Sequence, residues 1–296
     1  TDITPKNQTI TQLHDTGEDN TLYYSSWDNA LYELTWSQQP EQARTIHLHN
    51  SNTPIYRIEG EANKLLIGTW GEGIKVYDKE QERIYPLPGT EHLGTTFINA
   101  IYKDSRGFMW FGTAAGLARY DGYRFKIFRS TDNGSASLPD NYIEKIVEDS
   151  EGRLWIRTGE NGYVIYNWDT ESFVCDVRSR MWDIGIDGTP RYVFVDKQKN
   201  TWFAIDGKGC YCYRPGEKNA VSLPFGEKGI PEGVIIDMAE CKDGILLVYD
   251  NGRVICIDRE TVRVKWVLTD IAEHMGTRTD IFFLYVDKDE DLWIYG

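Results

Sequence analysis

One short sequence pattern returns seven times along this chain of 296 residues, and its clearest copy is Ile98–Phe125. Each copy reads as an apolar strand, an acidic turn, a second apolar strand, a turn of small residues, a third strand and a more polar last strand. A degenerate first copy begins at Leu22. A period of about 40 to 50 residues with four strands in each unit is typical of β-propellers. Equivalent second-strand positions lie 44 to 47 residues apart, at Leu66, Trp110, Trp155, Trp202, Leu247 and Trp293.

The pattern predicts an all-β chain that folds as a seven-bladed β-propeller of four-stranded antiparallel blades. We expect residues 1–296 to form a single propeller domain, because helical periodicity is missing from nearly the whole chain. The seventh copy stops at Gly296 with two strands missing, so the last blade is expected to be incomplete. Either the segment Thr1–Asn7 helps to complete this blade, or the sequence is cut within it.

The strands of the clearest copy differ in polarity. Met109–Thr113 and Leu117–Asp121 are apolar or aromatic on both faces, which predicts burial between neighbouring sheets. Phe125–Arg129 mixes charges with aromatic residues and fits an outermost strand with one solvent-exposed face. The acids in the turns before the second strands, such as Asp104 and Asp149, are expected to be structural, because Asp bonds its own turn backbone.

Composition argues against several classes of function. The net charge of −14 would repel a phosphate backbone, so nucleic acid is not expected as a partner. The longest strongly apolar run, Ile281–Val286, is far shorter than the about 20 residues that a membrane helix needs. The five cysteines have no CxxC spacing and predict buried thiols rather than zinc, with one disulfide between blades left open.

No metal site or cofactor is predicted. His47 and His49 lie on one outer strand, where a solvated strand face is expected rather than a metal site. Asp287, Asp289 and Asp291 imitate the start of a calcium loop, but Leu292 stands where such a loop needs glycine.

Motifs of catalysis are also missing, and no catalytic residue is predicted. The chain has no GxSxG, Walker, HExxH or dinucleotide-binding pattern. Carboxylate pairs for glycoside cleavage stay open as an alternative, because in a propeller they would come from different blades.

Several copies resemble a known family. Trp110–Thr113, Tyr120–Gly122, Asn141–Ile143 and Glu148–Trp155 are similar to the two-component regulator propeller repeat. This repeat builds the periplasmic sensor region of hybrid two-component systems, inner-membrane proteins that join a sensor, a histidine kinase and a response regulator. The resemblance therefore implies a periplasmic fragment of a larger sensor region. It also implies partners within the same protein, namely a second propeller and downstream domains, and leaves a homodimer open.

The loops that follow the outer and second strands suggest where a ligand would bind. Trp27 and Trp70 hold matching positions between the second and third strands of the first two copies. The long loop Arg178–Arg191 follows an outer strand and adds Arg178, Arg180 and Trp182. Arg157 replaces the strand-end glycine of other copies, which changes the surface at the mouth of the propeller. Aromatic faces with planar arginines suit a sugar, although the same residues can pack their own loops or contact another domain.

Three function classes follow. The favoured one is a sensory, non-enzymatic module that recognises an oligosaccharide or another small extracellular ligand and signals to an attached histidine kinase. The alternatives are a protein-interaction scaffold, which predicts an exposed apolar patch, and a polysaccharide lyase or glycosidase, which predicts acids converging at one mouth of the propeller.

Overall fold

The computed structural model describes residues 10–18, 20–36, 44–61, 63–130, 137–159, 162–226, 229–269, 283–287 and 292–295. The chain divides into two compact units, Thr1–Ile146 (unit 1) and Val147–Gly296 (unit 2). The segment Thr1–Asn7, one of the two alternatives for the end of the last blade, lies outside the described residues.

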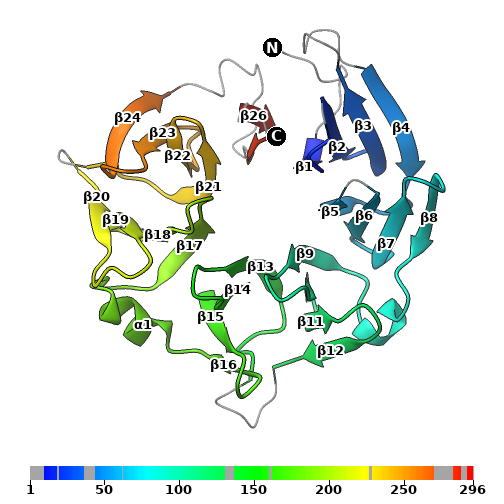
Figure 1. The fold of residues 1–296 in the computed structure, drawn as a ribbon, viewed down its shortest axis with the longest axis horizontal. Helices are drawn as coiled ribbons and strands as arrows, with labels where there is room; N and C mark the ends of the chain where they lie inside the picture. The colour runs from blue at the N-terminus through cyan, green and yellow to red at the C-terminus, as the bar shows by residue number, and fades with distance from the viewer. Residues whose placement is uncertain are drawn as a thin grey trace. The chain divides into compact units, whose positions relative to one another are not determined.

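Unit 1 contains three sheets, each made of four antiparallel strands that follow one another in the chain (Figure 1). The first holds β1 (Ile10–His14), β2 (Thr21–Ser26), β3 (Ala30–Thr35) and β4 (Arg44–Asn50). The second holds β5 (Ile55–Glu61), β6 (Lys64–Thr69), β7 (Ile74–Asp78) and β8 (Arg83–Pro86). The 3-10 helix η2 (Thr90–Leu93) then leads to β9 (Ile98–Lys103), β10 (Met109–Thr113), β11 (Gly116–Tyr120) and β12 (Phe125–Phe128).

Unit 2 continues the same order. The fourth sheet joins β13 (Ile143–Glu148), which begins at the end of unit 1, to β14 (Leu154–Thr158), β15 (Gly162–Asn167) and β16 (Ser172–Val174). After helix α1 (Val177–Asp183), the fifth holds β17 (Pro190–Val195), β18 (Thr201–Ile205), β19 (Gly209–Tyr213) and β20 (Val221–Pro224). The sixth holds β21 (Ile235–Cys241), β22 (Gly244–Tyr249), β23 (Val254–Asp258) and β24 (Arg263–Leu268), and β25 (Phe283–Val286) pairs with β26 (Leu292–Tyr295).

Within each unit, several successive sheets meet through their first strands. In unit 1, β5 contacts both β1 and β9, and in unit 2, β21 contacts both β17 and β25. The predicted all-β fold of four-stranded antiparallel blades is thus confirmed for six sheets. The seventh blade is described as two strands, so the count of seven stays a prediction, as does the single domain.

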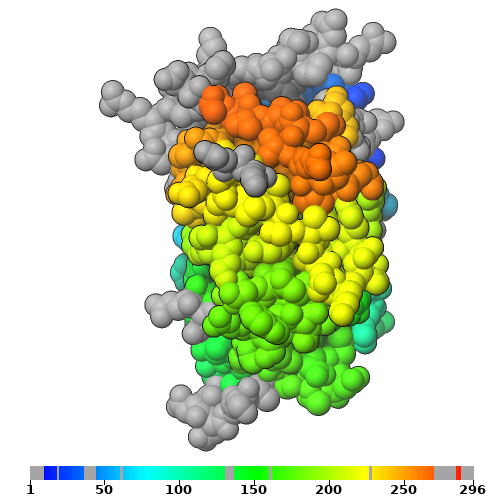
Figure 2. Space-filling view, turned by 90° about the vertical axis from the view of Figure 1, so that its left-hand side faces the viewer, coloured from blue at the N-terminus to red at the C-terminus, as the bar shows by residue number. Residues whose placement is uncertain are grey.

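Burial follows the predicted difference between inner and outer strands. Every residue of β18 and β22 is buried, whereas β24 is exposed at four of its six positions. The outer strands and α1 form one side of the unit 2 surface, coloured green to orange in Figure 2. All six second-strand positions named above lie on the second strands of their sheets.

The acids of the turns are structural, as expected. Asp149 accepts hydrogen bonds from the backbone N–H groups of Glu151 and Arg153 at 2.9 and 3.1 Å. Its second oxygen accepts from the indole Nε1 of buried Trp155 at 2.8 Å. The same bond joins Asp104 to Trp110 at 2.7 Å and Asp196 to Trp202 at 2.9 Å. Each acid therefore closes its turn and satisfies a buried indole six residues later.

One prediction about the loops was wrong. The sequence predicted a loop from Arg178 to Arg191, but Val177–Asp183 is helical. Asp176 caps this helix by accepting from the Ser179 N–H at 3.3 Å. Val177 and Met181, four residues apart, are both buried against unit 2. In the described part of the chain, α1 and every other helix fall short of the length and apolar content needed to cross a membrane.

Candidate ligand-binding surfaces

Unit 1 carries a group of four aromatic side chains that we call the aromatic cluster: Trp70, the rings of Tyr56 and Phe97 that contact it, and Tyr142, whose hydroxyl interacts electrostatically with Tyr56 and Arg57. The Tyr56 and Trp70 rings are stacked, with centroids 4.7 Å apart and an angle of 18° between their planes. Phe97 meets Trp70 edge-on at 6.4 Å. Phe97 is 46% exposed and Tyr142 is 38% exposed, so the cluster presents aromatic surface to solvent.

Hydrogen bonds fix the orientation of Trp70. Its indole Nε1 donates to Oδ1 of the buried Asn99 at 3.1 Å, and the Asn99 amide donates to the Ile143 carbonyl at 3.1 Å. The Trp70 N–H also donates to the Pro54 carbonyl at 2.9 Å. The following residue, Gly71, has φ 140° and approaches Thr53 so closely that a Cβ would lie 2.7 Å from a methyl carbon. The ring is therefore held in place before any ligand arrives.

A cation and a hydroxyl accompany these rings. The Arg57 guanidinium lies over the Tyr56 ring at 4.4 Å from its centroid, and it donates to the Tyr56 carbonyl at 2.7 Å. Partial burial raises the pKa of Tyr142 above its usual value, so its hydroxyl stays protonated at neutral pH. The cluster thus combines apolar faces with hydrogen-bonding groups at its edge.

The two tryptophans of unit 1 that were predicted to bind a ligand differ in their surroundings. Trp70 belongs to the aromatic cluster, where it stacks on Tyr56 of β5 and meets Phe97 edge-on. Trp27 lies in the turn between β2 and β3, is 61% exposed, and is not among the rings stacked on Trp70. Both turns lie at the same end of unit 1, because the Ser25 hydroxyl bonds to the Ile55 carbonyl and Ile55 pairs with Thr69.

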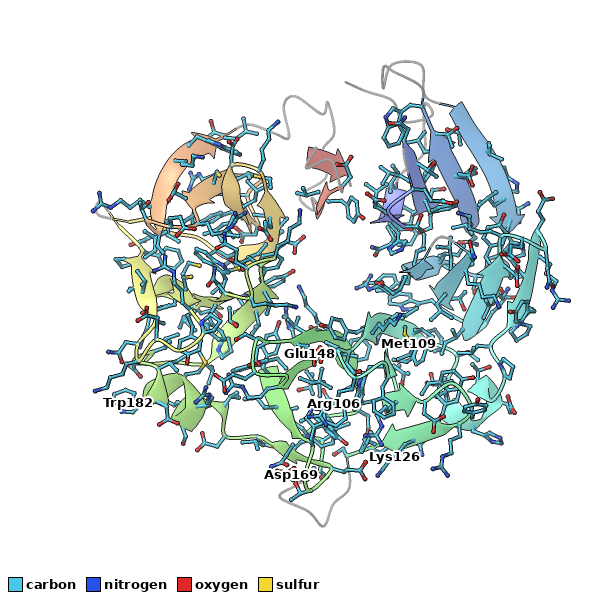
Figure 3. All side chains as sticks on the ribbon, in the orientation of Figure 1. Arg106, Met109, Lys126, Glu148, Asp169 and Trp182 are labelled. Atoms are coloured by element: carbon cyan, nitrogen blue, oxygen red, sulfur yellow. The ribbon has the colours of Figure 1, made fainter. Side chains whose placement is uncertain are left out.

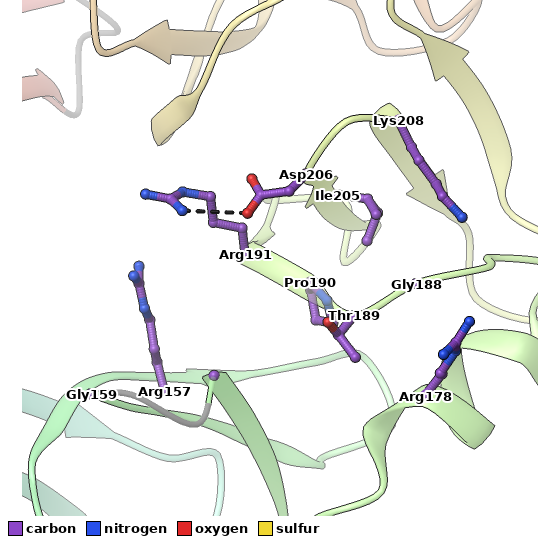
Figure 4. A pocket seen from close by; sticks show the side chains of 11 residues that line it. Arg157, Gly159, Arg178, Gly188, Thr189, Pro190, Arg191, Ile205, Asp206 and Lys208 are labelled. Atoms are coloured by element: carbon purple, nitrogen blue, oxygen red, sulfur yellow. Dashed lines mark hydrogen bonds and ion pairs between the residues drawn. The ribbon is translucent and has the colours of Figure 1, made fainter.

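Unit 2 contains a pocket between its fourth and fifth sheets, with a volume of about 560 Å³. Two of the predicted site residues, Arg157 on β14 and Arg178 on α1, line this pocket (Figure 4). Arg180 and Trp182 do not. Charged residues that the prediction missed complete it, namely Arg191, Asp206 and Lys208.

Ion pairs organise the charges around this unit 2 pocket. Asp187 accepts from Arg178 at 3.0 Å and from Lys208 at 2.6 Å, and Arg191 meets Asp206 at 3.4 Å. The hydrogen bonds from Lys208 and then Arg178 lower the pKa of Asp187, which is therefore ionised at neutral pH. Asp187 thus joins two of the cations of the pocket, and Asp206 joins a third.

The other two predicted residues of α1 point elsewhere. Arg180 pairs with Glu151 at 3.3 Å. Trp182 is 64% exposed and lies on the outer side of unit 2 (Figure 3). Neither residue shares a site with Arg157.

The aromatic cluster and the unit 2 pocket occupy equivalent positions in their sheets. The first strands of these two sheets, β5 and β17, both have a β-bulge after their first paired residue. The bulged residue is Tyr56 in β5 and Arg191 in β17. The residue after the second strand is Trp70 in one sheet and Asp206 in the other. A bulge redirects a side chain, so the repeat presents aromatic groups in one unit and charged groups in the other.

Arg157 stands at a position where the third sheet has glycine, and it changes the surface of the unit 2 pocket. In the third sheet its position is Gly112, where a Cβ would lie 2.8 Å from a methyl carbon of Ile143 on the next first strand. Arg157 replaces this close contact with a long cationic side chain that lines the cavity. The departure from the repeat was visible in the sequence, but Arg191 and Lys208, which line the same pocket, were not predicted.

Among the described residues, no group of three or more His, Cys, Asp or Glu side chains is arranged to hold a metal ion. His47 bonds to Asn50 at 2.8 Å and meets Tyr32 edge-on. The five cysteines are free thiols, four of them buried and Cys175 exposed.

Two segments, residues 92–115 and 137–160, match the family model described as "two component regulator propeller". The chain carries two-component regulator propeller repeats. The sequence prediction of this family is confirmed, and both segments belong to the third and fourth sheets. No curated protein matches the sequence.

Solved structures show the same fold. Two structures of the extracellular domain of BT4673 from B. thetaiotaomicron, described in one case as a one component system and in the other as a hybrid two component system, are each 21% identical to the chain. They give TM-scores of 0.66 and 0.68 and cover 99% and 98% of the chain. The chain spans 39% of the length of these relatives. The WD40 β-propeller domain of Doa1, 11% identical, gives a TM-score of 0.66 over 99% of this chain and 90% of its own. The fold is that of a β-propeller.

Proposed function

We propose that this chain is a ligand-sensing propeller of a periplasmic sensor region and that it recognises a carbohydrate through the aromatic cluster. Binding is passed to a histidine kinase attached to the same protein. The matched repeats and the extracellular domains of similar fold support the sensor role. The chain itself is proposed to be non-enzymatic, and other domains of the sensor are its proposed partners.

The observation that carries the carbohydrate proposal is the exposed aromatic surface built on a fixed tryptophan. The CH face of a sugar ring stacks on such a surface, and its hydroxyls pair with nearby polar groups. Because Trp70 is held by Asn99 and stacked on Tyr56, little ordering accompanies binding. Arg57 lies beside the rings and supplies donors for the hydroxyls.

The test is calorimetric titration of the chain with a panel of uncharged oligosaccharides. Phe97→Ala and Tyr142→Ala remove part-exposed rings, so the fold is retained. We expect each substitution to weaken binding about 10-fold, equal to about 1.4 kcal/mol. Tyr123→Ala is the matched control, because Tyr123 is 93% exposed in the same unit and lies outside the cluster.

Two outcomes would oppose the proposal. A panel in which no oligosaccharide binds would remove the carbohydrate ligand. Binding that Phe97→Ala and Tyr142→Ala leave at the level of Tyr123→Ala would place the ligand away from the aromatic cluster.

A further inference from the structure

Trp27 presents an indole to solvent at the same end of unit 1 as the aromatic cluster. It lies directly after β2, the place that Trp70 holds after β6, and it is 61% exposed. The repeat does not need an aromatic residue there, since the third to sixth sheets carry Ala114, Gly159, Asp206 and Asp250. One exposed apolar side chain is ordinary on a protein surface, so its meaning depends on what lies beside it.

The turn that carries Trp27 is fixed by its own hydrogen bonds. Asn29 has a left-handed φ of 64°, and its N–H donates to the Ser26 carbonyl at 3.0 Å. The Asp28 carboxylate accepts hydrogen bonds from the Ala30 N–H at 3.1 Å and from the Ser26 hydroxyl. The backbone on both sides of Trp27 is therefore ordered before a ligand arrives, which lowers the entropy cost of binding there.

Three polar residues, which we call the polar strip, lie between this turn and the turn of Trp70: Ser51, Asn52 and Glu72. The Ser51 N–H donates to the Asn29 carbonyl in the turn of Trp27 at 2.7 Å. Glu72, two residues after Trp70, accepts from the Ser51 hydroxyl at 2.8 Å and from the Asn52 amide at 2.7 Å. Direct contacts thus run without a break from one tryptophan turn to the other.

We infer that the carbohydrate ligand is a linear oligosaccharide that crosses the polar strip and stacks a second sugar ring on Trp27. Its first ring, on the aromatic cluster, is that of the proposed function, on which this assignment rests. The second contact and the length of the ligand go beyond it. Packed sheets lie about 10 Å apart, farther than one sugar ring extends, so a further ring lies between the two that stack.

The chemistry of the polar strip suits the middle of such a chain. Asn52 is exposed, and its amide group both donates and accepts hydrogen bonds, as sugar hydroxyls do. Glu72 adds carboxylate oxygens that accept from hydroxyls, and it is held in place by Lys75 at 2.6 Å. Stacking at the two ends with hydrogen bonds between them is the combination that a chain of sugar rings can satisfy.

The experiment measures affinity against chain length by isothermal titration calorimetry. The probes are the di-, tri-, tetra- and hexasaccharides of the cello, xylo, manno and malto series. In the series that binds, we expect the hexasaccharide to bind about 10-fold or more tightly than the disaccharide, because a second contact on the same molecule adds to the first. Equal affinity of the two would overturn the second contact, and binding of no series would remove the proposed function together with it.

Substitution of Trp27 then locates the second contact. Trp27→Ala should weaken binding of the hexasaccharide about 10-fold and leave the disaccharide within about twofold, because only the longer ligand reaches this turn. Trp27→Tyr keeps an aromatic face and should stay within about threefold of the wild type. The matched control, Trp182→Ala, removes an indole of similar exposure, 64%, on the outer side of unit 2 (Figure 3) and should change neither affinity.

Phe97→Ala separates the second contact from the proposed function. It should weaken binding of both the disaccharide and the hexasaccharide, because both place a ring on the aromatic cluster. That result combined with wild-type hexasaccharide affinity in Trp27→Ala would refute the second contact and retain the proposed function. Weakened hexasaccharide binding in Trp27→Ala with wild-type affinities in Phe97→Ala would instead remove the aromatic cluster as the first contact, and both proposals with it.

Discussion

Replacing Asp149 with alanine should destabilise the protein by about 2 to 5 kcal/mol, because its carboxylate accepts hydrogen bonds from the turn and from a buried indole of the fourth sheet. The side chain is 1% exposed and accepts four hydrogen bonds, two from backbone N–H groups and one each from Trp155 and Arg153. Water can reach the turn and Arg153, so those losses total about 1 to 2 kcal/mol. The buried Trp155 N–H finds no substitute, which adds about 1 to 3 kcal/mol.

Urea denaturation followed by circular dichroism measures this loss. Asp169→Ala is the control, since Asp169 lies exposed in the turn between β15 and β16 of the same sheet (Figure 3) and should change stability by less than about 0.5 kcal/mol. A double-mutant cycle of Asp149→Ala with Trp155→Phe should give a coupling of about 1 to 2 kcal/mol. A loss below about 1 kcal/mol for Asp149→Ala would refute the structural role of this side chain.

Three further predictions address pH, thiols and the wall of the unit 2 pocket. The hydrogen bond from Lys75 lowers the pKa of Glu72 to about 2, so the stability that ionised Glu72 contributes is present above the unfolded pKa of 4.5 and lost as pH falls through 2. The free energy of unfolding should therefore fall more between pH 5 and pH 2.5 in the wild type than in Glu72→Gln. An equal fall in the two proteins would contradict this prediction. With a thiol reagent, Cys175 alone should react in the native protein and four more thiols after unfolding; early reaction of a second thiol would be inconsistent with their burial. Gly188→Ala should lower the thermal unfolding midpoint, because the added carbon would lie 2.8 Å from a methyl carbon of Ile205 and the residue has a φ of 144°; an unchanged midpoint would contradict this strain.

Local patterns made the scaffold predictable. The six-residue spacing from Asp149 to Trp155 recurs in the sequence, because the same hydrogen bond from the indole to the turn carboxylate forms in three sheets. This spacing marks the turn and the start of the second strand in each sheet. Helix α1 was missed because its apolar spacing covers only Val177 and Met181, too short a stretch for periodicity to show. Its cap, Asp176 with Ser179, was a readable signal.

The sites were less predictable, because they join residues from different repeats. Trp70 was expected at a ligand surface, but its companion Tyr56 is directed there by a β-bulge that no sequence pattern reveals. Phe97 and Tyr142 each directly precede the first buried isoleucine of a first strand, and this repeated position was a signal that could have found them. Arg191 joins the unit 2 pocket through the equivalent bulge in β17.

The measurement that tests the central proposal most directly is ¹⁹F NMR of the chain labelled with 5-fluorotryptophan, titrated with the tightest-binding uncharged oligosaccharide. Trp70→Phe and Trp27→Phe assign two of the four tryptophan resonances of unit 1, and Trp182→Phe assigns that of Trp182. We predict that the Trp70 resonance shifts in step with ligand occupancy, because the sugar lies on the aromatic cluster, while the exposed Trp182 resonance stays unchanged. A saturable shift at Trp27 or Trp182 with none at Trp70 would contradict the aromatic cluster as the carbohydrate site.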